Sequence, residues 1–254
     1  MAVLDLFSLK GKNALVTASS QGLGAGMAFA LAQAGANVTL HGHTDVSKSI
    51  IEEVAKTGVR SITVTGDVRD PAVCNRIVDE TVNAFGSIDI LVNNAGTIRR
   101  APAAEHSHEF WATVIDTNLN SVFYLSQYAG TKMLAQGSGK IINIASMLTF
   151  QGGIFVPSYA AAKGAVGQLT KALANEWACK GVNVNAIAPG YMETANTAPL
   201  RADEDRSKAI LSRIPAGRWG LPSDLAGAAV FLASAASDYV HGHILAVDGG
   251  WLCR

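Results

Sequence analysis

A tyrosine and a lysine four positions apart are the residues of this sequence best suited to proton transfer. Tyr159 and Lys163 lie in the alanine-rich stretch 158–179, which predicts a helix, so their side chains share one face. A phenol ordinarily has a pKa of about 10, and a nearby ammonium lowers it by favouring the phenolate. Ser146, at the end of a predicted strand, supplies a hydroxyl that can hold a substrate oxygen. These residues predict a general acid–base site with Tyr159 as the proton carrier.

A turn of small residues follows the first predicted strand and reads Thr-Ala-Ser-Ser-Gln-Gly-Leu-Gly over 17–24. A turn of this kind between a strand and a helix lets backbone N–H groups and the helix N-terminus face a phosphate. Glycine permits a close approach, but a tight turn also favours glycine without any ligand, so the turn alone leaves both readings open. The candidate phosphate-binding residues are Thr17, Ser19, Gln21, Gly22, Leu23 and Gly24.

Polar residues also follow the later predicted strands. Asp67 and Val68 come after the third strand, where a carboxylate can meet an adenine amino group, and Asn94, Ala95 and Gly96 come after the fourth. The carboxyl ends of parallel strands are where ligands of open α/β sheets bind. We therefore expect these residues to lie around one binding crevice.

The elements that position these residues alternate along the chain. Strands are predicted at 13–17, 37–41, 61–65, 88–93, 140–145, 183–188 and 244–247, and helices at 24–34, 46–56, 71–85, 107–136, 158–179 and 222–233. Strands separated by long helices indicate βαβ units and a parallel sheet with helices on both faces. The prediction is a single α/β domain over 1–254, a Rossmann-like doubly wound parallel sheet of about seven strands.

The segment 191–215 interrupts this alternation, because it carries many charges, two prolines and little periodicity. Loops longer than about 12–15 residues in a compact domain are usually functional or disordered. We predict a mobile lid with a short helix, and a passive surface insertion is the alternative.

The ordered set of glycine turn, Asn-Asn-Ala-Gly, serine, Tyr-x-x-x-Lys and Pro-Gly resembles the short-chain dehydrogenase/reductase family over essentially the whole chain. The resemblance implies hydride transfer between a CH–OH group and a nicotinamide cofactor. It also implies that Lys163 binds the nicotinamide ribose and that Asn118 holds a water of the proton relay. The residues that it places at the nicotinamide carboxamide are Pro189, Gly190, Met192 and Thr194. In the family the long helices pair between subunits, so we expect a homotetramer.

One position departs from the family pattern. Ala18 stands where the first fingerprint glycine usually follows the threonine. A methyl group crowds the backbone there only if φ must be positive. We expect the turn to survive with somewhat reduced affinity for phosphate.

The second half of the chain is most similar to one bacterial branch of this family. Segments such as 144–147, 175–178, 188–192, 213–220 and 247–251 resemble the dehydrogenases that act on 2-deoxy-D-gluconate or 2-dehydro-3-deoxy-D-gluconate. The resemblance implies a keto or hydroxy sugar acid as substrate. Gluconate 5-dehydrogenase and 3-oxoacyl-carrier-protein reductase are the alternative enzymes. A catalytically silent nucleotide-binding regulator is the alternative of another class, although such proteins usually lack the tyrosine or the lysine.

The sequence is ambiguous about the choice between NAD and NADP. A carboxylate at the end of the second strand typically selects NAD, and a cation nearby accommodates the 2′-phosphate of NADP. Gly42 stands where the family's aspartate usually lies, and His43 stands at the usual arginine position. A neutral His43 would bind a phosphate poorly and Asp45 would oppose it, so we expect NAD, with NADP as the alternative.

Arginines supply candidates for binding the carboxylate of a sugar acid, because a planar guanidinium holds a carboxylate in a bidentate way. Arg99 and Arg100 directly follow the fourth strand, and Gln151 and Tyr191 are candidates for the sugar hydroxyls. Three further arginines flank the predicted lid and can close over the same group: Arg206, Arg213 and Arg218.

Composition narrows the remaining function classes. Twenty basic and twenty acidic residues give a formal net charge of zero, which argues against a nucleic-acid partner. The first ten residues do not resemble a signal peptide, and no apolar run reaches the length of a membrane span, so no membrane partner is expected.

Three widely spaced cysteines indicate reduced thiols and a cytoplasmic protein. All six histidines form His-x-His pairs, but no cysteine or carboxylate cluster accompanies them, so no metal is expected.

Overall fold

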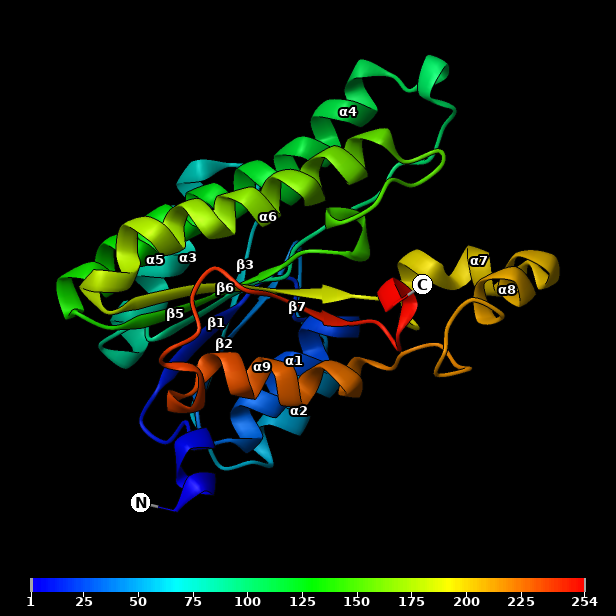
Figure 1. The fold of residues 1–254 in the computed structure, drawn as a ribbon. Coiled ribbons are helices and arrows are strands. Elements are labelled where there is room, and N and C mark those ends of the chain that lie inside the picture. The colour runs from blue at the N-terminus through cyan, green and yellow to red at the C-terminus, as the bar shows by residue number, and fades with distance from the viewer. Residues whose placement is uncertain (1, 254) are drawn as a thin grey trace.

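The computed structural model describes residues 2–253, which form a parallel sheet covered by helices on both faces (Figure 1). The strands are β1 (Asn13–Val16), β2 (Asn37–Gly42), β3 (Ser61–Thr65), β4 (Ile90–Asn93), β5 (Gly139–Ile144), β6 (Val182–Pro189) and β7 (Ile244–Val247). The helices are α1 (Gly22–Gln33), α2 (Lys48–Ala55), α3 (Pro71–Phe85), α4 (His108–Ile115), α5 (Ser121–Gln136), α6 (Pro157–Trp177), α7 (Ala198–Ala202), α8 (Glu204–Leu211) and α9 (Ala226–Ala233). The predicted fold class is confirmed.

Every strand pair in the sheet is parallel, and the strand order is β3-β2-β1-β4-β5-β6-β7. From β1 the chain adds strands first toward one edge of the sheet, as β2 and β3, and then toward the other edge, from β4 onward. The change occurs between β1 and β4, which pair through Ala14–Ile90, Leu15–Leu91 and Val16–Val92. Ligands of open α/β sheets bind outside the carboxyl ends of the strands at such a switch point. The glycine turn after β1 and the Asn-Asn-Ala-Gly segment after β4 flank this point.

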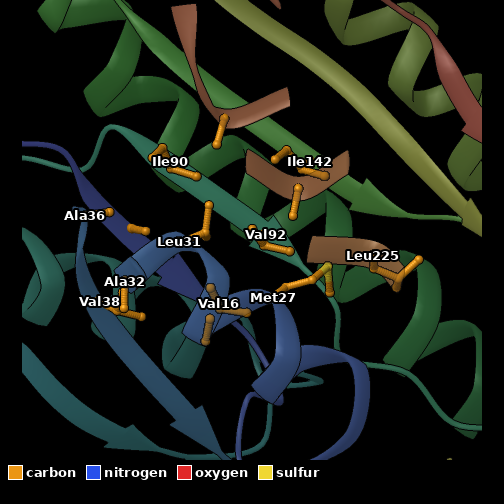
Figure 2. Packing of buried hydrophobic residues seen from close by; sticks show 14 of the residues in the cluster. Val16, Met27, Leu31, Ala32, Ala36, Val38, Ile90, Val92, Ile142 and Leu225 are labelled. Carbon is orange, nitrogen blue, oxygen red and sulfur yellow. The ribbon is translucent and has the colours of Figure 1, made fainter. Parts of the chain in front are cut away.

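Two apolar layers hold the helices to the sheet. Residues of β1, β4 and β5 are almost fully buried, as expected for parallel strands covered on both faces. On one face, Met27 and Leu31 of α1 pack with Leu225 against Val16 and Val92 (Figure 2). Helices α3, α5 and α6 cover the opposite face, while α1, α2 and α9 lie together on the first (Figure 1).

The cap of α3 was predictable from its residues. The Asp70 carboxylate accepts a hydrogen bond of 2.8 Å from the N–H of Ala72, and Pro71 occupies the first helical position. Gly86 ends the helix with a φ of +92°. The Pro71–Phe85 boundaries match the prediction, because both ends carry strong local signals.

Two regions differ from the expected elements. The stretch 107–136, expected as one helix, is divided into α4 and α5 by a π-helical turn at Asp116–Asn120. The expected lid at 191–215 contains two helices, α7 and α8, rather than one short helix. Figure 1 shows both of them beyond the carboxyl end of β6, next to the C-terminus.

Within residues 2–253, no helix combines the length and the apolar character needed to cross a bilayer. The same part of the chain contains no group of three or more His, Cys, Asp or Glu side chains placed to hold a metal ion. Cys74 is a buried free thiol, and Cys179 and Cys253 are exposed free thiols.

Candidate active site

A cavity of about 750 Å³ opens at the carboxyl ends of β5 and β6 and contains the candidate proton-transfer residues. Ser146 follows β5 and Tyr159 lies in the first turn of α6, and both line the cavity. Lys163 lies one turn further along α6 and is only 3% exposed. The predicted grouping of serine, tyrosine and lysine is therefore present at one site.

Lys163 is held beside the tyrosine ring rather than beside its hydroxyl. Its Nζ donates a hydrogen bond of 2.5 Å to the carbonyl of Ile144 at the end of β5 and lies 5.7 Å from the centroid of the Tyr159 ring. Burial lowers the pKa of Lys163 to about 8.

The pKa of Tyr159 differs from the expectation that Lys163 would lower it. Burial raises the pKa of the phenol above its ordinary value, while a hydrogen bond with Ser146 and the charge of Arg100 act in the opposite direction. Lys163 is not among the groups that shift it. The phenol is therefore protonated at neutral pH and can donate a proton.

Hydrogen bonds hold the glycine turn in place and join it to the segment after β4. Thr17 Oγ1 accepts the N–H groups of Asn94 and Ala95 at 2.9 and 3.0 Å, which ties the turn to the segment after β4. The Asn94 amide donates to the carbonyls of Thr17 and Ala18, and Ser19 Oγ donates to the carbonyl of Val16. The side chains of Thr17 and Ser19 therefore hold the turn itself, which leaves backbone groups and the start of α1 for a phosphate.

The shape of the turn fits a dinucleotide phosphate. At Gly22, where φ is +59°, an added Cβ would meet nothing closer than Thr194 Cγ2 at 4.0 Å, so there is open space in front of the helix N-terminus. At Gly24 an added Cβ would lie 2.3 Å from the Ala18 carbonyl oxygen, so the turn closes directly on the helix there. Gln21 precedes α1 and is exposed, and Leu23 lines the cavity. These features can hold a pyrophosphate at the N-terminus of α1.

Ala18 adopts the conformation that the sequence left in doubt. Its φ is +49°, in the left-handed region that favours glycine. The turn therefore forms with a methyl group at a position of positive φ.

The expected adenine end of the crevice carries a paired carboxylate. Asp67 accepts hydrogen bonds from Arg69 Nε at 2.8 Å and from the Arg69 backbone N–H at 3.0 Å, and these contacts hold the pKa of its carboxyl below the ordinary value. Val68 is buried. At the end of β2, Gly42 cannot carry a side chain, because an added Cβ would lie 1.7 Å from the carbonyl oxygen of Asp45, and His43 is exposed.

Asn118 lies in the π-helical turn and uses its side chain on the neighbouring loop. Its Oδ1 accepts the Thr97 N–H at 2.8 Å and its Nδ2 donates to the Thr97 carbonyl at 2.7 Å. An added Cβ on Gly96 would lie 2.8 Å from this Oδ1, so the glycine is required for the contact. π turns often occur at functional sites, but the amide of Asn118 is already engaged with Thr97.

The two neighbouring arginines after β4 point in different directions. Arg100 lines the cavity and donates to the carbonyl of Asn196 at 3.1 Å. Arg99 is not among the residues that line it; its guanidinium donates to Thr97 Oγ1 at 3.1 Å and lies 5.9 Å from the Phe110 ring centroid. The other predicted site residues on the cavity wall are Gln151, Pro189, Gly190, Tyr191, Met192 and Thr194.

The lid region supplies two of the three flanking arginines. Arg206 and Arg213 line the cavity, whereas Arg218 pairs with Asp224 at 2.6 Å outside it. Sequence reasoning missed Trp251, which is 5% exposed and forms part of the cavity wall, with Arg213 stacked 4.1 Å above its ring. Its place after a glycine pair near the chain end gave no periodic signal.

Comparison with known proteins agrees with this arrangement. A family model described as enoyl-(acyl carrier protein) reductase matches residues 17–252. The 2-dehydro-3-deoxy-D-gluconate 5-dehydrogenase of Dickeya dadantii (strain 3937) is 56% identical, over 99% of this chain and 100% of that protein. The chain belongs to the short-chain dehydrogenase/reductase family.

Solved structures of this family superpose closely on the protein. One, provisionally named a 2-deoxy-D-gluconate 3-dehydrogenase from Agrobacterium tumefaciens and holding NADP, is 55% identical with a TM-score of 0.93, over 98% of this chain and 100% of that chain. A gluconate 5-dehydrogenase from Burkholderia cenocepacia J2315, in complex with NADP and tartrate, is 40% identical with a TM-score of 0.95, over 100% of both chains. As a member of this family, the protein is an oxidoreductase that uses a nicotinamide cofactor and acts on CH–OH groups.

Proposed function

We propose that this short-chain dehydrogenase/reductase interconverts a keto and a hydroxy sugar acid, and that its substrate is of the 2-dehydro-3-deoxy-D-gluconate or 2-deoxy-D-gluconate type. The observation that carries the proposal is the 56% identity, over nearly the full length, to a 2-dehydro-3-deoxy-D-gluconate 5-dehydrogenase. A cavity with arginines at its wall beside Ser146 and Tyr159 supports a substrate that combines a carbonyl with a carboxylate.

In the proposed mechanism, a bound nicotinamide dinucleotide supplies the hydride for reduction or accepts it in oxidation. Ser146 Oγ holds the substrate oxygen by a hydrogen bond. Tyr159 Oη donates its proton to that oxygen during reduction, and the raised pKa keeps the phenol protonated at neutral pH. Arg100 favours the phenolate that remains.

The residues around this pair position the cofactor in the same proposal. Lys163 holds the nicotinamide ribose, the turn 17–24 holds the pyrophosphate, and Pro189 to Thr194 meet the carboxamide. Asn118 organises the proton relay by holding Thr97 in the loop after β4. The segment 191–215, with α7 and α8, closes over the substrate as a lid.

The cofactor proposed is NADP(H), in place of the NAD expected from the sequence. Relatives 55% and 40% identical to this chain hold NADP. Gly42 leaves the end of β2 without the carboxylate that would oppose a 2′-phosphate, and the neighbouring Asp45 is exposed to solvent.

One assay tests substrate and cofactor together. The purified protein is mixed with NADPH or NADH and a panel of 2-dehydro-3-deoxy-D-gluconate, 5-keto-D-gluconate and a 3-oxoacyl thioester. We expect the highest kcat/KM with the deoxy sugar acid, and a value at least as high with NADPH as with NADH. A preference for the thioester would overturn the substrate proposal, and a tenfold preference for NADH would overturn the cofactor proposal.

The carboxylate of the substrate is proposed to bind Arg100. Charged hydrogen bonds of this kind contribute about 1.5–3 kcal/mol, so Arg100→Ala is expected to raise the KM for the sugar acid about tenfold or more. Arg99→Ala is the matched control, because its guanidinium is directed to Thr97 and Phe110 rather than to the cavity. The KM for the neutral, carboxylate-free analogue should be the same in the two variants. Equal losses on acid and analogue in Arg100→Ala would place the carboxylate site elsewhere.

Cofactor binding is expected to depend on the protonation of Lys163. The pKa of this lysine is lowered to about 8, so the side chain is positively charged well below that pH and loses its charge as the pH rises through it. The dissociation constant for NADPH should therefore increase by up to about tenfold per pH unit above 8. Titrations between pH 6.5 and 9.5 should show this increase in the wild type and not in Lys163→Met. A constant affinity across that range in the wild type would contradict the role of the ammonium.

A homotetramer is proposed as the assembly. Phe110 and Trp111 of α4 and Phe123 of α5 are 36–44% exposed, and large apolar side chains on the surface are candidates for burial between subunits. These helices form the outer layer on one face of the sheet (Figure 1). Sedimentation velocity at micromolar concentration should give the mass of a tetramer, and Phe123→Glu should lower it. A monomer at that concentration would exclude the proposal.

A further inference from the structure

His41 is a buried histidine that joins three strand ends at the dinucleotide crevice. It lies near the carboxyl end of β2 and is 2% exposed. Its Nδ1 accepts the backbone N–H of Ala18 at 3.0 Å, and its Nε2 lies 3.0 Å from the carbonyl of Gly66, after β3. The ring therefore connects the turn after β1 with the loop after β3.

These two contacts define the protonation of the ring. A carbonyl oxygen only accepts hydrogen bonds, so Nε2 carries a hydrogen and donates it to Gly66. A backbone N–H only donates, so Nδ1 must be unprotonated to accept it from Ala18. The observed arrangement requires the neutral imidazole with its hydrogen on Nε2.

His41 contacts Ala18, which occupies the position where the family pattern has a glycine. Ala18 has a φ of +49°, which is unfavourable for a residue with a Cβ. The carbonyl of Ala18 receives the Asn94 amide at 3.1 Å and lies against Gly24 in the first turn of α1. The Ala18 conformation therefore sets the position of the helix N-terminus relative to the turn.

We propose that neutral His41 is a positioning residue of the dinucleotide site: it holds Ala18 in the left-handed conformation and so compensates for the missing glycine. The inference rests on the proposed role of the turn 17–24 in binding the cofactor pyrophosphate. The backbone of His41 strengthens the same link, because its N–H donates to Ser19 Oγ and its carbonyl accepts the Ser19 N–H, both at 2.8 Å.

The proposal makes dinucleotide affinity sensitive to acid. An imidazolium carries hydrogens on both nitrogens, so it cannot accept the Ala18 N–H, and two donors then face each other. The charged groups that act on His41 are His43 on the same strand end, Arg76 of α3 and Asp67 after β3. Burial, with His43 and Arg76, keeps the pKa of His41 below 6.5, while the hydrogen bond to Gly66 and the charge of Asp67 act against this. The protein therefore binds the dinucleotide with its full affinity above pH 6.5, where His41 is neutral, and loses affinity as the pH falls through the lowered pKa of His41.

Two isosteric variants separate the contacts of the ring. The terminal amide of asparagine reaches as far as Nδ1 and can accept from Ala18, whereas that of glutamine reaches as far as Nε2 and can donate to Gly66. NADPH is titrated into each full-length variant, followed by protein fluorescence, between pH 5.5 and 8. We expect His41→Gln to bind NADPH about tenfold more weakly at pH 7.5, and His41→Asn to bind within about threefold of the wild type.

Rescue and pH dependence distinguish positioning from a merely structural role. Ala18→Gly in the His41→Gln background should restore most of the affinity, because glycine adopts positive φ without help. The loss of affinity in acid should be present in the wild type, absent in His41→Asn, and retained in His43→Gln. Equal affinities of the two His41 variants, or a double variant as weak as His41→Gln, would overturn this inference while the cofactor site stands. Failure of the wild type to bind NADPH at all would overturn the cofactor site as well.

Discussion

Replacement of Tyr159 by phenylalanine is expected to lower kcat by about a hundredfold to ten-thousandfold, the usual contribution of general acid–base catalysis. The ring still fills its place at the start of α6, with Lys163 beside its face, so only the proton donor is removed. The dissociation constant for NADPH should stay within about twofold of the wild-type value, because the phosphate-binding turn is untouched. Steady-state kinetics and circular dichroism measure the two effects.

The matched control is Tyr239→Phe. This tyrosine is 100% exposed and lies outside the cavity, so removal of its hydroxyl should change neither kcat nor affinity. If Tyr159→Phe keeps more than a tenth of the wild-type turnover while remaining folded, another group transfers the proton.

Replacement of Gly24 by alanine is expected to weaken NADPH binding about tenfold to hundredfold. The new methyl group would lie 2.3 Å from the Ala18 carbonyl oxygen and 2.4 Å from Asn94 Nδ2, so the turn must move away from the N-terminus of α1. Overpacking of this kind costs about 1–3 kcal/mol, and each 1.4 kcal/mol corresponds to about a factor of ten in affinity. Calorimetric titration with NADPH measures the loss.

Gly227→Ala is the control for this substitution, since it makes the same chemical change in α9. An added Cβ at Gly227 meets nothing within 4 Å, and alanine is the better helix former by about 1 kcal/mol. This variant should bind NADPH like the wild type and unfold at the same or a higher temperature. Equal affinities of the Gly24 and Gly227 variants would show that the turn does not position the cofactor.

Elements with strong local signals were predicted well from the sequence. The boundaries of α3 follow from Asp70, Pro71 and Gly86, whose effects are confined to the helix ends. The central strands were found because burial on both faces requires continuous apolar runs, which distinguish them from the surrounding helices. The strand order was not predicted, since pairing depends on contacts between residues far apart in the chain.

Features that depend on tertiary contacts were not predictable. The sequence predicted one short helix in the segment 191–215 and did not give the bounds of α7 and α8. The charged, exposed residues of α8 give almost no apolar periodicity, and this helix is stabilised instead by its Asp203 cap and by the burial of Ile210. The sequence does not indicate which of Arg99 and Arg100 lines the cavity. In an irregular loop the side-chain directions of adjacent residues follow no fixed periodicity and depend on tertiary contacts.

The pKa of Tyr159 shows a further limit of spacing arguments. The interval of four residues correctly predicted that Tyr159 and Lys163 share one face of a helix, but not that the ammonium lies beside the ring instead of the hydroxyl. That direction is decided by the Ile144 carbonyl, which belongs to a strand distant in sequence. Burial of the phenol, also a tertiary property, then determines the sign of the pKa shift.

The turn that carries Trp251 has a practical consequence for handling the protein. Asp248 fixes this turn by accepting the N–H groups of Gly250 and Leu252, each at 2.9 Å, and so holds the indole in the cavity wall. A purification tag or an immobilisation linker fused after this turn would lie next to the part of the cavity wall that Trp251 forms. Figure 1 shows the N-terminus at the far side of the molecule, below α1 and α2. Fusion partners and surface attachment therefore belong at the N-terminus, away from the cavity wall.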